Sequence, residues 1–258
     1  MHVRELLDLT GKVAVVTGGS RGLGLQMASA LAEAGAALAI TARKVDELEG
    51  TAARLRAAGF RVFAFPCDVS RPEQIDAAVT RMLEEFGGID ILVNNAGATW
   101  GAPALEMPLD GWRKVMETNV TGTFQMTQAV GRSMIGAGRP GKIINIASIA
   151  GLVGSDPGVL DAVGYSTSKG AVIAMTRDLA VKWAPHGVTV NAIAPGFFPS
   201  KMTRWLIEHR GEVLRSTIPM GRLGGEDDLK GAVVFLASAA SNFITGHVLV
   251  VDGGAAAR

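Results

Sequence analysis

Short apolar runs alternate with longer segments of helical periodicity along almost the whole chain. The apolar runs are mostly continuous, which is typical of strands that are covered on both faces of a sheet. We predict strands at Val13–Val16, Leu38–Thr41, Arg61–Phe65, Ile91–Val93, Ile143–Ile146, Val188–Ile193 and Val248–Val251. Between them we predict helices that include Leu23–Ala34, Val45–Ala57, Pro72–Phe86 and Ala171–Trp183.

Residues at the predicted element boundaries agree with this assignment. Pro72 falls where a first-turn proline fits, with Ser70 before it as a cap, and Gly35 and Gly59 stand where helices must end. Strands that alternate with helices in this way form parallel sheets with right-handed crossovers. We therefore predict the α/β class, with a Rossmann-type, doubly wound parallel sheet and helices on both of its faces.

Nothing in the 258 residues marks an internal boundary or repeat, so we predict a single domain over residues 1–258. Residues 195–225 interrupt the alternation of strands and helices, because they contain no convincing strand and include Pro195, Pro199 and Pro219. A segment inserted before the last helix and strand would lie over the carboxyl edge of the sheet, where ligands bind. We interpret residues 195–225 as a substrate lid.

Composition narrows the function classes. The formal net charge is +1, which gives no basic surface for nucleic acid. Cys67 is the only cysteine, no stretch approaches the ~20 apolar residues of a membrane span, and the first residues lack the apolar run of a signal peptide. The four histidines match no metal spacing. We expect a cytoplasmic protein without nucleic-acid, membrane or metal partners.

The first predicted strand runs into a glycine-rich turn at Thr17–Gly24, and a helix follows. The spacing of its glycines is G-x-x-x-G-x-G, which differs from the common G-x-G-x-x-G dinucleotide fingerprint. Free N–H groups and the helix dipole favour a phosphate at such a helix start. Three glycines in eight residues also suit an ordinary turn, but the position after the first strand favours a dinucleotide phosphate site.

The end of the second predicted strand indicates which dinucleotide binds. NAD-binding proteins of this class carry an acidic residue there, whereas a nearby arginine accommodates the 2′-phosphate of NADP. The strand here ends Thr41-Ala42-Arg43-Lys44, without a carboxylate. Arg43, together with Arg21 of the glycine-rich turn, therefore favours NADP(H).

A tyrosine and a lysine four residues apart open a later helical segment, at Tyr165 and Lys169. At this spacing the phenol and the ammonium share one helix face. A free tyrosine has a pKa near 10, and a neighbouring cation favours the phenolate. Tyr165 is the only tyrosine of the chain, although an isolated Y-x-x-x-K also recurs by chance.

Taken together, these residues resemble the classical short-chain dehydrogenases/reductases from about Leu9 to Gly254. Beyond the turn and the tyrosine–lysine pair, the resemblance rests on motifs in the family's order: Asp68-Val69, Asn94-Asn95-Ala96-Gly97, Asn119, Ser148, Pro195-Gly196 and Asp252-Gly253-Gly254. It implies an enzyme that reduces a carbonyl compound, or oxidises the alcohol, by hydride transfer with NADP(H).

The resemblance also implies a catalytic set of Asn119, Ser148, Tyr165 and Lys169. Tyr165 is expected to exchange a proton with the substrate oxygen, and Ser148 to stabilise the charge on that oxygen. Lys169 is expected to lower the pKa of the tyrosine and to hold the nicotinamide ribose. Asn119 is expected to kink its helix and to anchor a water of a proton relay.

Further residues are expected to bind the cofactor. They are Gly18, Ser20, Arg21, Gly22, Leu23, Gly24, Arg43, Asp68, Val69, Asn95, Ala96, Gly97, Tyr165, Lys169, Pro195, Gly196, Phe198 and Ser200. Ser200 stands where the family has a threonine, so a serine hydroxyl must make that residue's contact with the carboxamide.

The substrate is less well defined, because family membership does not select it. We expect the pocket to be lined by Trp100, Leu152, Val153, Phe197, Met202 and Trp205. This set favours an apolar carbonyl compound, such as a 3-oxoacyl thioester, although the same residues could pack the lid against the core. Residues 195–223 also resemble gluconate 5-dehydrogenase-like members, so a polyol or sugar-acid dehydrogenase is the alternative.

Partner and assembly predictions complete the picture. Acyl-carrier-protein reductases of this family carry a basic pair near the site entrance. The matching positions here are Arg139 and His186, and His186 is only a weak base. The sequence therefore does not establish a carrier-protein substrate. The resemblance suggests a homotetramer. A dinucleotide-sensing regulator without turnover is a remote alternative, because such proteins typically lose a catalytic residue and this chain keeps all four.

Overall fold

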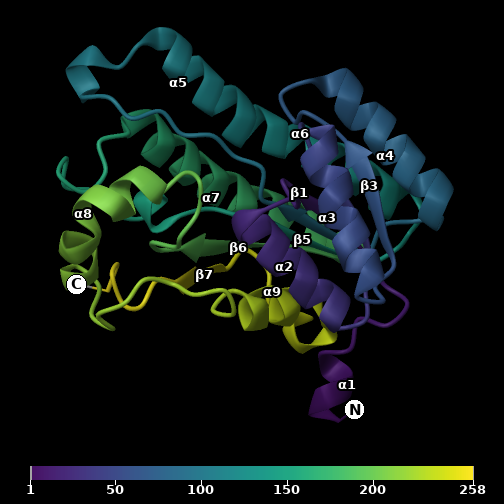
Figure 1. The fold of residues 1–258 in the computed structure, drawn as a ribbon. Helices are drawn as coiled ribbons and strands as arrows, with labels where there is room; N and C mark the ends of the chain where they lie inside the picture. Colours follow the sequence, from purple (N-terminus) through teal and green to yellow (C-terminus); the bar gives the residue numbers. More distant parts are fainter. Residues whose placement is uncertain (1, 258) are drawn as a thin grey trace.

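The structure is a computed structural model that describes residues 2–257. It is built on one seven-stranded parallel sheet (Figure 1). The strands are β1 (Val13–Thr17), β2 (Ala37–Ala42), β3 (Val62–Pro66), β4 (Ile91–Asn94), β5 (Gly141–Ile146), β6 (Val188–Pro195) and β7 (Val248–Val251). Their order is β3-β2-β1-β4-β5-β6-β7. The strands β2 and β3 therefore lie on one side of β1, and β4 to β7 lie on its other side. Doubly wound sheets bind ligands at this switch point, between β1 and β4.

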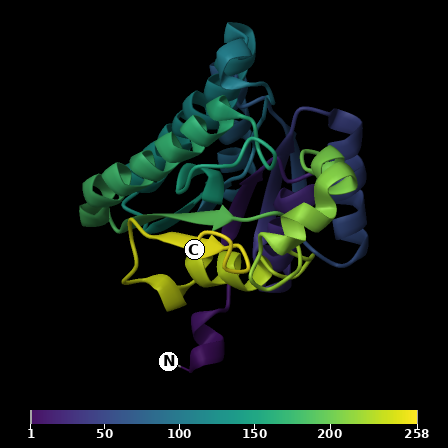
Figure 2. The same cartoon turned by 90° about the vertical axis from the view of Figure 1, so that its left-hand side faces the viewer.

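Helices cover both faces of the sheet. The main helices are α2 (Gly22–Glu33), α3 (Val45–Ala57), α4 (Pro72–Phe86), α5 (Leu109–Met116), α6 (Gly122–Gly136), α7 (Val163–Trp183), α8 (Arg204–Ser216) and α9 (Lys230–Ala237), and a short α1 (Val3–Leu6) precedes β1. One apolar cluster joins α2, α3 and α9 to the sheet, and another joins α4, α6 and α7. Figure 2 shows the long α7, in green, alongside the teal α5–α6 segment.

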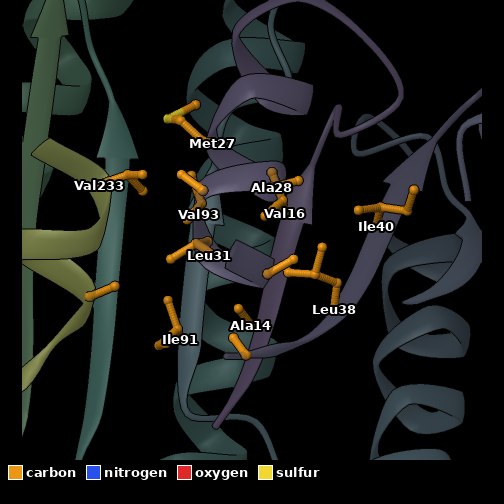
Figure 3. Packing of buried hydrophobic residues seen from close by; sticks show 14 of the residues in the cluster. Ala14, Val16, Met27, Ala28, Leu31, Leu38, Ile40, Ile91, Val93 and Val233 are labelled. Carbon is orange, nitrogen blue, oxygen red and sulfur yellow. The ribbon is translucent and has the colours of Figure 1, made fainter. Parts of the chain in front are cut away.

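Successive side chains of a strand point to opposite faces of the sheet, so each strand contributes to the apolar clusters on both faces. Ala14 and Val16 of β1 belong to the cluster under α2, while Val15 belongs to the opposite cluster. Figure 3 shows Met27 and Leu31 of α2 packed against the strands, and both are fully buried. Burial of such a side chain contributes about 1.5–3 kcal/mol. Because both faces are covered, the strands are apolar at nearly every position.

The predicted sheet and helices are confirmed. Gly35 and Gly59 have φ values of 103° and 91°, so each ends a helix in a conformation that favours glycine. Pro72 occupies the first turn of α4, as predicted. The predicted cap was wrong: the residue at the cap position is Arg71, and Ser70 donates its hydroxyl to Asp68 Oδ1 at 2.8 Å instead.

Residues 195–225 contain no strand after Pro195 and hold α8. This helix is interrupted at Arg210, whose φ of −136° and ψ of 16° are not helical. Across residues 2–257, none of the helices combines the length and the apolar character that crossing a membrane requires.

Candidate active site

The glycine-rich turn joins β1 to α2 at the carboxyl edge of the sheet. Gly18 and Gly22 have φ values of 66° and 54°, which other residues rarely adopt. A Cβ at Gly24 would collide with the carbonyl oxygen of Gly18. These three positions thus require glycine for local backbone reasons, and the resulting turn directs the first N–H groups of α2 outward.

A cavity of about 660 Å³ extends from this turn across the edge of the sheet. All residues predicted to bind the cofactor line it: Gly18, Ser20, Arg21, Gly22, Leu23, Gly24, Arg43, Asp68, Val69, Asn95, Ala96, Gly97, Tyr165, Lys169, Pro195, Gly196, Phe198 and Ser200. A Cβ at Gly22 would meet only Ser200, at 4.0 Å, so the backbone there is open to a ligand. The volume, the exposed backbone and the flanking arginines fit a dinucleotide.

Both predicted phosphate-binding arginines flank this cavity and face carboxylates. Arg21 Nη1 lies 2.8 Å from Glu47 Oε2, and Arg43 Nη1 lies 3.9 Å from Asp68 Oδ2. Both guanidinium groups are about half exposed or more, so these ion pairs are weak and can be exchanged for a phosphate.

Ser148, Tyr165 and Lys169 meet where β5 ends and α7 begins. Lys169 lies one helical turn after Tyr165, with Nζ 5.6 Å from the centre of the tyrosine ring. The same ammonium donates a hydrogen bond to the main-chain oxygen of Ile146 at 2.7 Å. Ser148 follows β5 directly and interacts with the phenol of Tyr165. The structure thus brings the predicted hydroxyl, phenol and ammonium groups together.

Asn119 lies in a π-helical turn, Glu117–Thr121, between α5 and α6. Such turns mark an irregularity inside a helix and are frequent at functional sites. The Asn119 amide donates to Ser168 Oγ and to the carbonyl of Ala98, each at 2.9 Å, and accepts from the Ala98 N–H at 2.7 Å. The predicted distortion at Asn119 is confirmed, and the side chain joins the loop after β4 to α7.

Burial dominates the electrostatics of this site. It raises the pKa of Tyr165, and the hydrogen bond with Ser148 opposes that change. Burial also lowers the pKa of Lys169 to about 8. The net effect on the pKa of Tyr165 is upward, so burial outweighs the lowering expected from Lys169. At neutral pH the phenol carries its proton, which is the form that a general acid requires.

A second cavity, of about 730 Å³, adjoins the first at Ser148 and Tyr165. Four of the six predicted substrate-pocket residues line it: Val153, Phe197, Met202 and Trp205. The other two do not. Trp100 packs against Gly111 and lies 5.5 Å from Lys114 Nζ, and Leu152 is 39% exposed.

Two lining residues were not anticipated from the sequence. Glu47 lines the first cavity, and Arg210 lines the second. Both belong to helices whose sequences resemble ordinary surface segments, so no local pattern distinguishes them. Only the proximity of residues distant in the sequence places them at the site.

Arg139 and His186 are remote from this site within the chain. Arg139 precedes β5 and donates a hydrogen bond to the main-chain oxygen of Gly87, which precedes β4. His186 precedes β6. Ser148 follows β5, so both residues lie at the opposite edge of the parallel sheet from the catalytic groups. The expected position of this basic pair near the site entrance is therefore wrong for a single chain.

Comparison with known proteins identifies the family. The sequence model of the family described as Enoyl-(Acyl carrier protein) reductase matches residues 18–256. This chain belongs to the short-chain dehydrogenase/reductase family. Family members use NAD(P), so the chain is an oxidoreductase that acts on CH–OH groups or on the corresponding ketones, as the sequence predicted.

Individual relatives of the family cover the whole chain. The 2-dehydro-3-deoxy-D-gluconate 5-dehydrogenase of Escherichia coli (strain K12) is 42% identical, over 99% of this chain and 100% of the relative. The 3-oxoacyl-[acyl-carrier-protein] reductase FabG of Vibrio cholerae is 39% identical, over 96% and 98%. A gluconate 5-dehydrogenase from Burkholderia cenocepacia J2315, solved in complex with NADP and tartrate, has a TM-score of 0.94 at 39% identity, with both chains fully covered.

Proposed function

We propose that this enzyme reduces a ketone with NADPH and that Tyr165 donates the proton. NADPH, when bound, supplies a hydride to the carbonyl carbon. The phenolic O–H of Tyr165 gives its proton to the carbonyl oxygen, and the product is a secondary alcohol. Ser148 donates a hydrogen bond to the same oxygen and stabilises its developing negative charge. The observation that carries this proposal is the convergence of Ser148, Tyr165 and Lys169 at the junction of the two cavities.

Two further residues support this reaction. Lys169 holds a positive charge beside the phenol, which favours the phenolate that remains after proton transfer, and binds the nicotinamide ribose. Asn119 acts as a positioning residue, because its amide connects the loop at Ala98 to Ser168 in the turn of α7 that carries Lys169.

The preference for NADPH over NADH rests on the adenosine end of the first cavity. Arg21 and Arg43 line it, and the end of β2 supplies no carboxylate. A charge-assisted hydrogen bond to phosphate contributes about 1.5–3 kcal/mol. Arg43→Asp is therefore expected to weaken NADPH binding at least about tenfold and to spare NADH by comparison. Tighter binding of NADH than of NADPH by the wild type, at equal salt, would contradict this preference.

For the substrate we propose a keto acid with several hydroxyl groups, of the 5-ketogluconate type. Sugar-acid enzymes are prominent among the relatives and solved neighbours. The second cavity also offers groups for such a molecule: Asp156 and Asp161 can accept hydrogen bonds from hydroxyls, and Arg210 can bind a carboxylate. Within residues 2–257, Arg210 forms no ion pair, so its guanidinium is available.

A 3-oxoacyl thioester is the second candidate. The apolar side chains of Val153, Leu160, Phe197 and Trp205 favour it, because they could contact an acyl chain. The match to a 3-oxoacyl reductase at 39% identity is consistent with this possibility.

One set of assays separates the two candidates. NADPH oxidation is followed at 340 nm with 5-ketogluconate, with a neutral ketone and with a 3-oxoacyl thioester. The keto acid is expected to give the highest kcat/KM, and Arg210→Gln is expected to raise its KM about tenfold or more while leaving the neutral ketone unchanged. Arg204→Gln, on the same helix but outside the cavity, serves as the matched control. A higher kcat/KM for the thioester, unaffected by Arg210→Gln, would favour the second candidate.

We further propose that the enzyme is cytoplasmic and forms a homotetramer, in which each chain is a single dinucleotide-binding domain. Phe124 of α6 and Val181 of α7 are 42% and 77% exposed, and Phe243 beside β7 is fully exposed. Burial of such side chains between subunits would remove apolar surface from water. Light scattering at micromolar concentration tests this proposal, and a particle of 26.8 kDa would contradict it.

A further inference from the structure

One carboxylate occupies a donor that the proposed function assigns to the 2′-phosphate, the guanidinium of Arg21. Glu47 lies in the first turn of α3 and extends toward the glycine-rich turn. Its Oε1 accepts a hydrogen bond from Ser20 Oγ at 2.8 Å, and its Oε2 accepts one from Arg21 Nη1 at 2.8 Å. Both carboxylate oxygens are therefore bound to side chains of the phosphate-binding turn.

The surroundings hold this arrangement in place. Thr51, one turn after Glu47 on α3, donates its hydroxyl to the main-chain oxygen of Ser20 at 2.8 Å, and both Thr51 and Ser20 are buried. The contact between α3 and the turn is thus fixed by a buried hydrogen bond. Glu47 itself is half-buried and lines the dinucleotide cavity.

We propose that Glu47 is a cofactor-selectivity residue that competes with the 2′-phosphate of NADP(H) for Ser20 and Arg21. A hydroxyl and a guanidinium are donors that suit a phosphate as well as a carboxylate. Two anions cannot share them without repulsion, so binding of NADP(H) displaces the Glu47 side chain. NAD(H) has a 2′-hydroxyl in place of the phosphate and leaves the contacts of Glu47 intact.

Glu47 thereby lowers the preference for NADP(H) over NAD(H) that Arg21 and Arg43 provide. The arginines attract the 2′-phosphate, while Glu47 weakens that attraction by neutralising one of them in advance. The consequence is a preference for NADP(H) that is smaller than two arginines without a competing carboxylate would give. This inference rests on the proposed cofactor preference and adds the residue that limits it.

Calorimetric titration with two nucleotide fragments tests the inference without turnover. The fragments are adenosine 2′,5′-bisphosphate, which carries the 2′-phosphate, and adenosine 5′-monophosphate, which lacks it. Glu47→Gln is expected to tighten binding of the bisphosphate about threefold to tenfold and to leave the monophosphate unchanged. The matched control is Glu49→Gln, which removes the same charge from a carboxylate of α3 that does not line the cavity and whose partner is Arg56 at 3.9 Å.

A double-variant cycle distinguishes direct competition from a general charge effect. If Glu47 acts through Arg21, the gain from Glu47→Gln disappears in an Arg21→Gln background. Equal gains in Glu47→Gln and Glu49→Gln, or a gain that persists without Arg21, would overturn the inference. Weaker bisphosphate binding by Glu47→Gln would also overturn it, because Glu47 would then orient the donors instead of competing for them.

The wild-type titration separates this inference from the proposed function. If the wild type binds the bisphosphate more tightly than the monophosphate and Glu47→Gln has no effect, only the role of Glu47 fails. If the wild type binds the bisphosphate no better than the monophosphate and Glu47→Gln does not change this, the proposed NADPH preference fails as well.

Discussion

Asn119 binds the backbone of Ala98 with both ends of its amide: Oδ1 accepts from the Ala98 N–H at 2.7 Å, and Nδ2 donates to the Ala98 carbonyl at 2.9 Å. The π-helical turn orients this side chain toward Ala98, because one extra residue in the turn rotates Asn119 relative to α5 and α6. The loop after β4, which lines the dinucleotide cavity through Asn95–Gly97, is thereby attached to the helical layer.

Asn119→Ala is expected to lower both stability and turnover. Three hydrogen bonds at a 1% exposed side chain are lost, and buried partners left unsatisfied cost about 1–3 kcal/mol each before relaxation. We expect the free energy of unfolding to fall by roughly 2–4 kcal/mol and kcat by at least about tenfold. Denaturant unfolding and steady-state kinetics measure the two effects. The surface variant Gln128→Ala on α6 is the control, and an Asn119→Ala enzyme with normal kcat would contradict the positioning role.

Tyr165→Phe removes the proposed proton donor and leaves the shape of the site almost unchanged. We expect kcat to fall at least about 100-fold, because no other positioned O–H group can protonate the carbonyl oxygen as efficiently. The affinity for NADPH is expected to stay near that of the wild type, since the phenol makes little contact with the phosphates or adenine. Single-turnover kinetics and fluorescence titration of NADPH test the two expectations. Near-normal turnover would refute the mechanism.

The two directions of the reaction are expected to respond oppositely to pH. Burial raises the pKa of Tyr165 above its ordinary value of 10, so the phenol is protonated throughout the neutral range. Reduction uses the protonated form and is available there, whereas alcohol oxidation needs the phenolate. We therefore expect kcat/KM for oxidation to rise between pH 7 and 10, and kcat/KM for reduction not to rise. A rate of oxidation that is independent of pH over this range, with chemistry rate-limiting, would show that another group accepts the proton.

Continuous apolar runs made the sheet predictable from the sequence, and the backbone conformations that only glycine adopts readily made the glycine-rich turn predictable. Val13–Val16 are apolar at every position because both faces of β1 are covered, and Gly18 and Gly22 have positive φ values that identify their positions. Tyr165 and Lys169 were recognisable because their spacing puts them on one helix face and because the other family motifs surround them in order. The residues that were predicted best are those whose chemistry depends on neighbours in the sequence.

The residues that were predicted poorly are ones whose surroundings depend on distant neighbours. Trp100 was expected in the substrate pocket, but Gly111 lacks a Cβ and leaves a surface on α5 against which the indole packs. Glu47 and Arg210 are charged residues on helices, where a solvated side chain is the ordinary expectation, and only the approach of α3 and α8 to the cavities gives them another role. The course of the loops, which no local pattern encodes, decided these positions.

Lys142 is expected to destabilise the enzyme below about pH 8. It lies at the amino edge of β5, donates a hydrogen bond to Ser241 Oγ at 3.3 Å, and burial lowers its pKa to about 8. The folded state thus disfavours the charged amine. Below pH 8 both states carry the proton and the penalty is complete, and between about 8 and the ordinary 10.5 the unfolded chain binds more protons, so stability from this group rises with pH.

Lys142→Met should therefore raise the Tm at pH 7 and lose this advantage as the pH approaches 10. Partial exposure screens the charge, so we expect about 1 kcal/mol, or roughly 2–4 °C in a chain of this size. Thermal unfolding at pH 7, 8.5 and 10 measures the effect. Lys182→Met, which removes an exposed lysine paired with Asp178, is the control. A Tm increase that is the same at all three pH values would show that packing, and not the charge of Lys142, is responsible.

The loop between Ser148 and Tyr165 is expected to select substrates without affecting cofactor binding. Its ends are fixed: a short 3₁₀ turn, Ile149–Gly151, follows Ser148, and Ala162 pairs with Ala102 before α7 begins. The part between these anchors, from Val153 to Asp161, lines the substrate cavity, whereas no residue from 149 to 164 lines the dinucleotide cavity.

Shortening the loop by four residues within Ser155–Leu160 removes the side chain of Leu160 or its neighbours from the cavity wall. One tenfold change in kcat/KM corresponds to about 1.4 kcal/mol, which a few lost contacts in a pocket can supply. We therefore expect the ratio of kcat/KM between 5-ketogluconate and a 3-oxoacyl thioester to change at least about tenfold, with the Kd for NADPH unchanged. If every ketone kept its rank and its rate, substrate selection would depend on the residues from Phe197 to Trp205 alone.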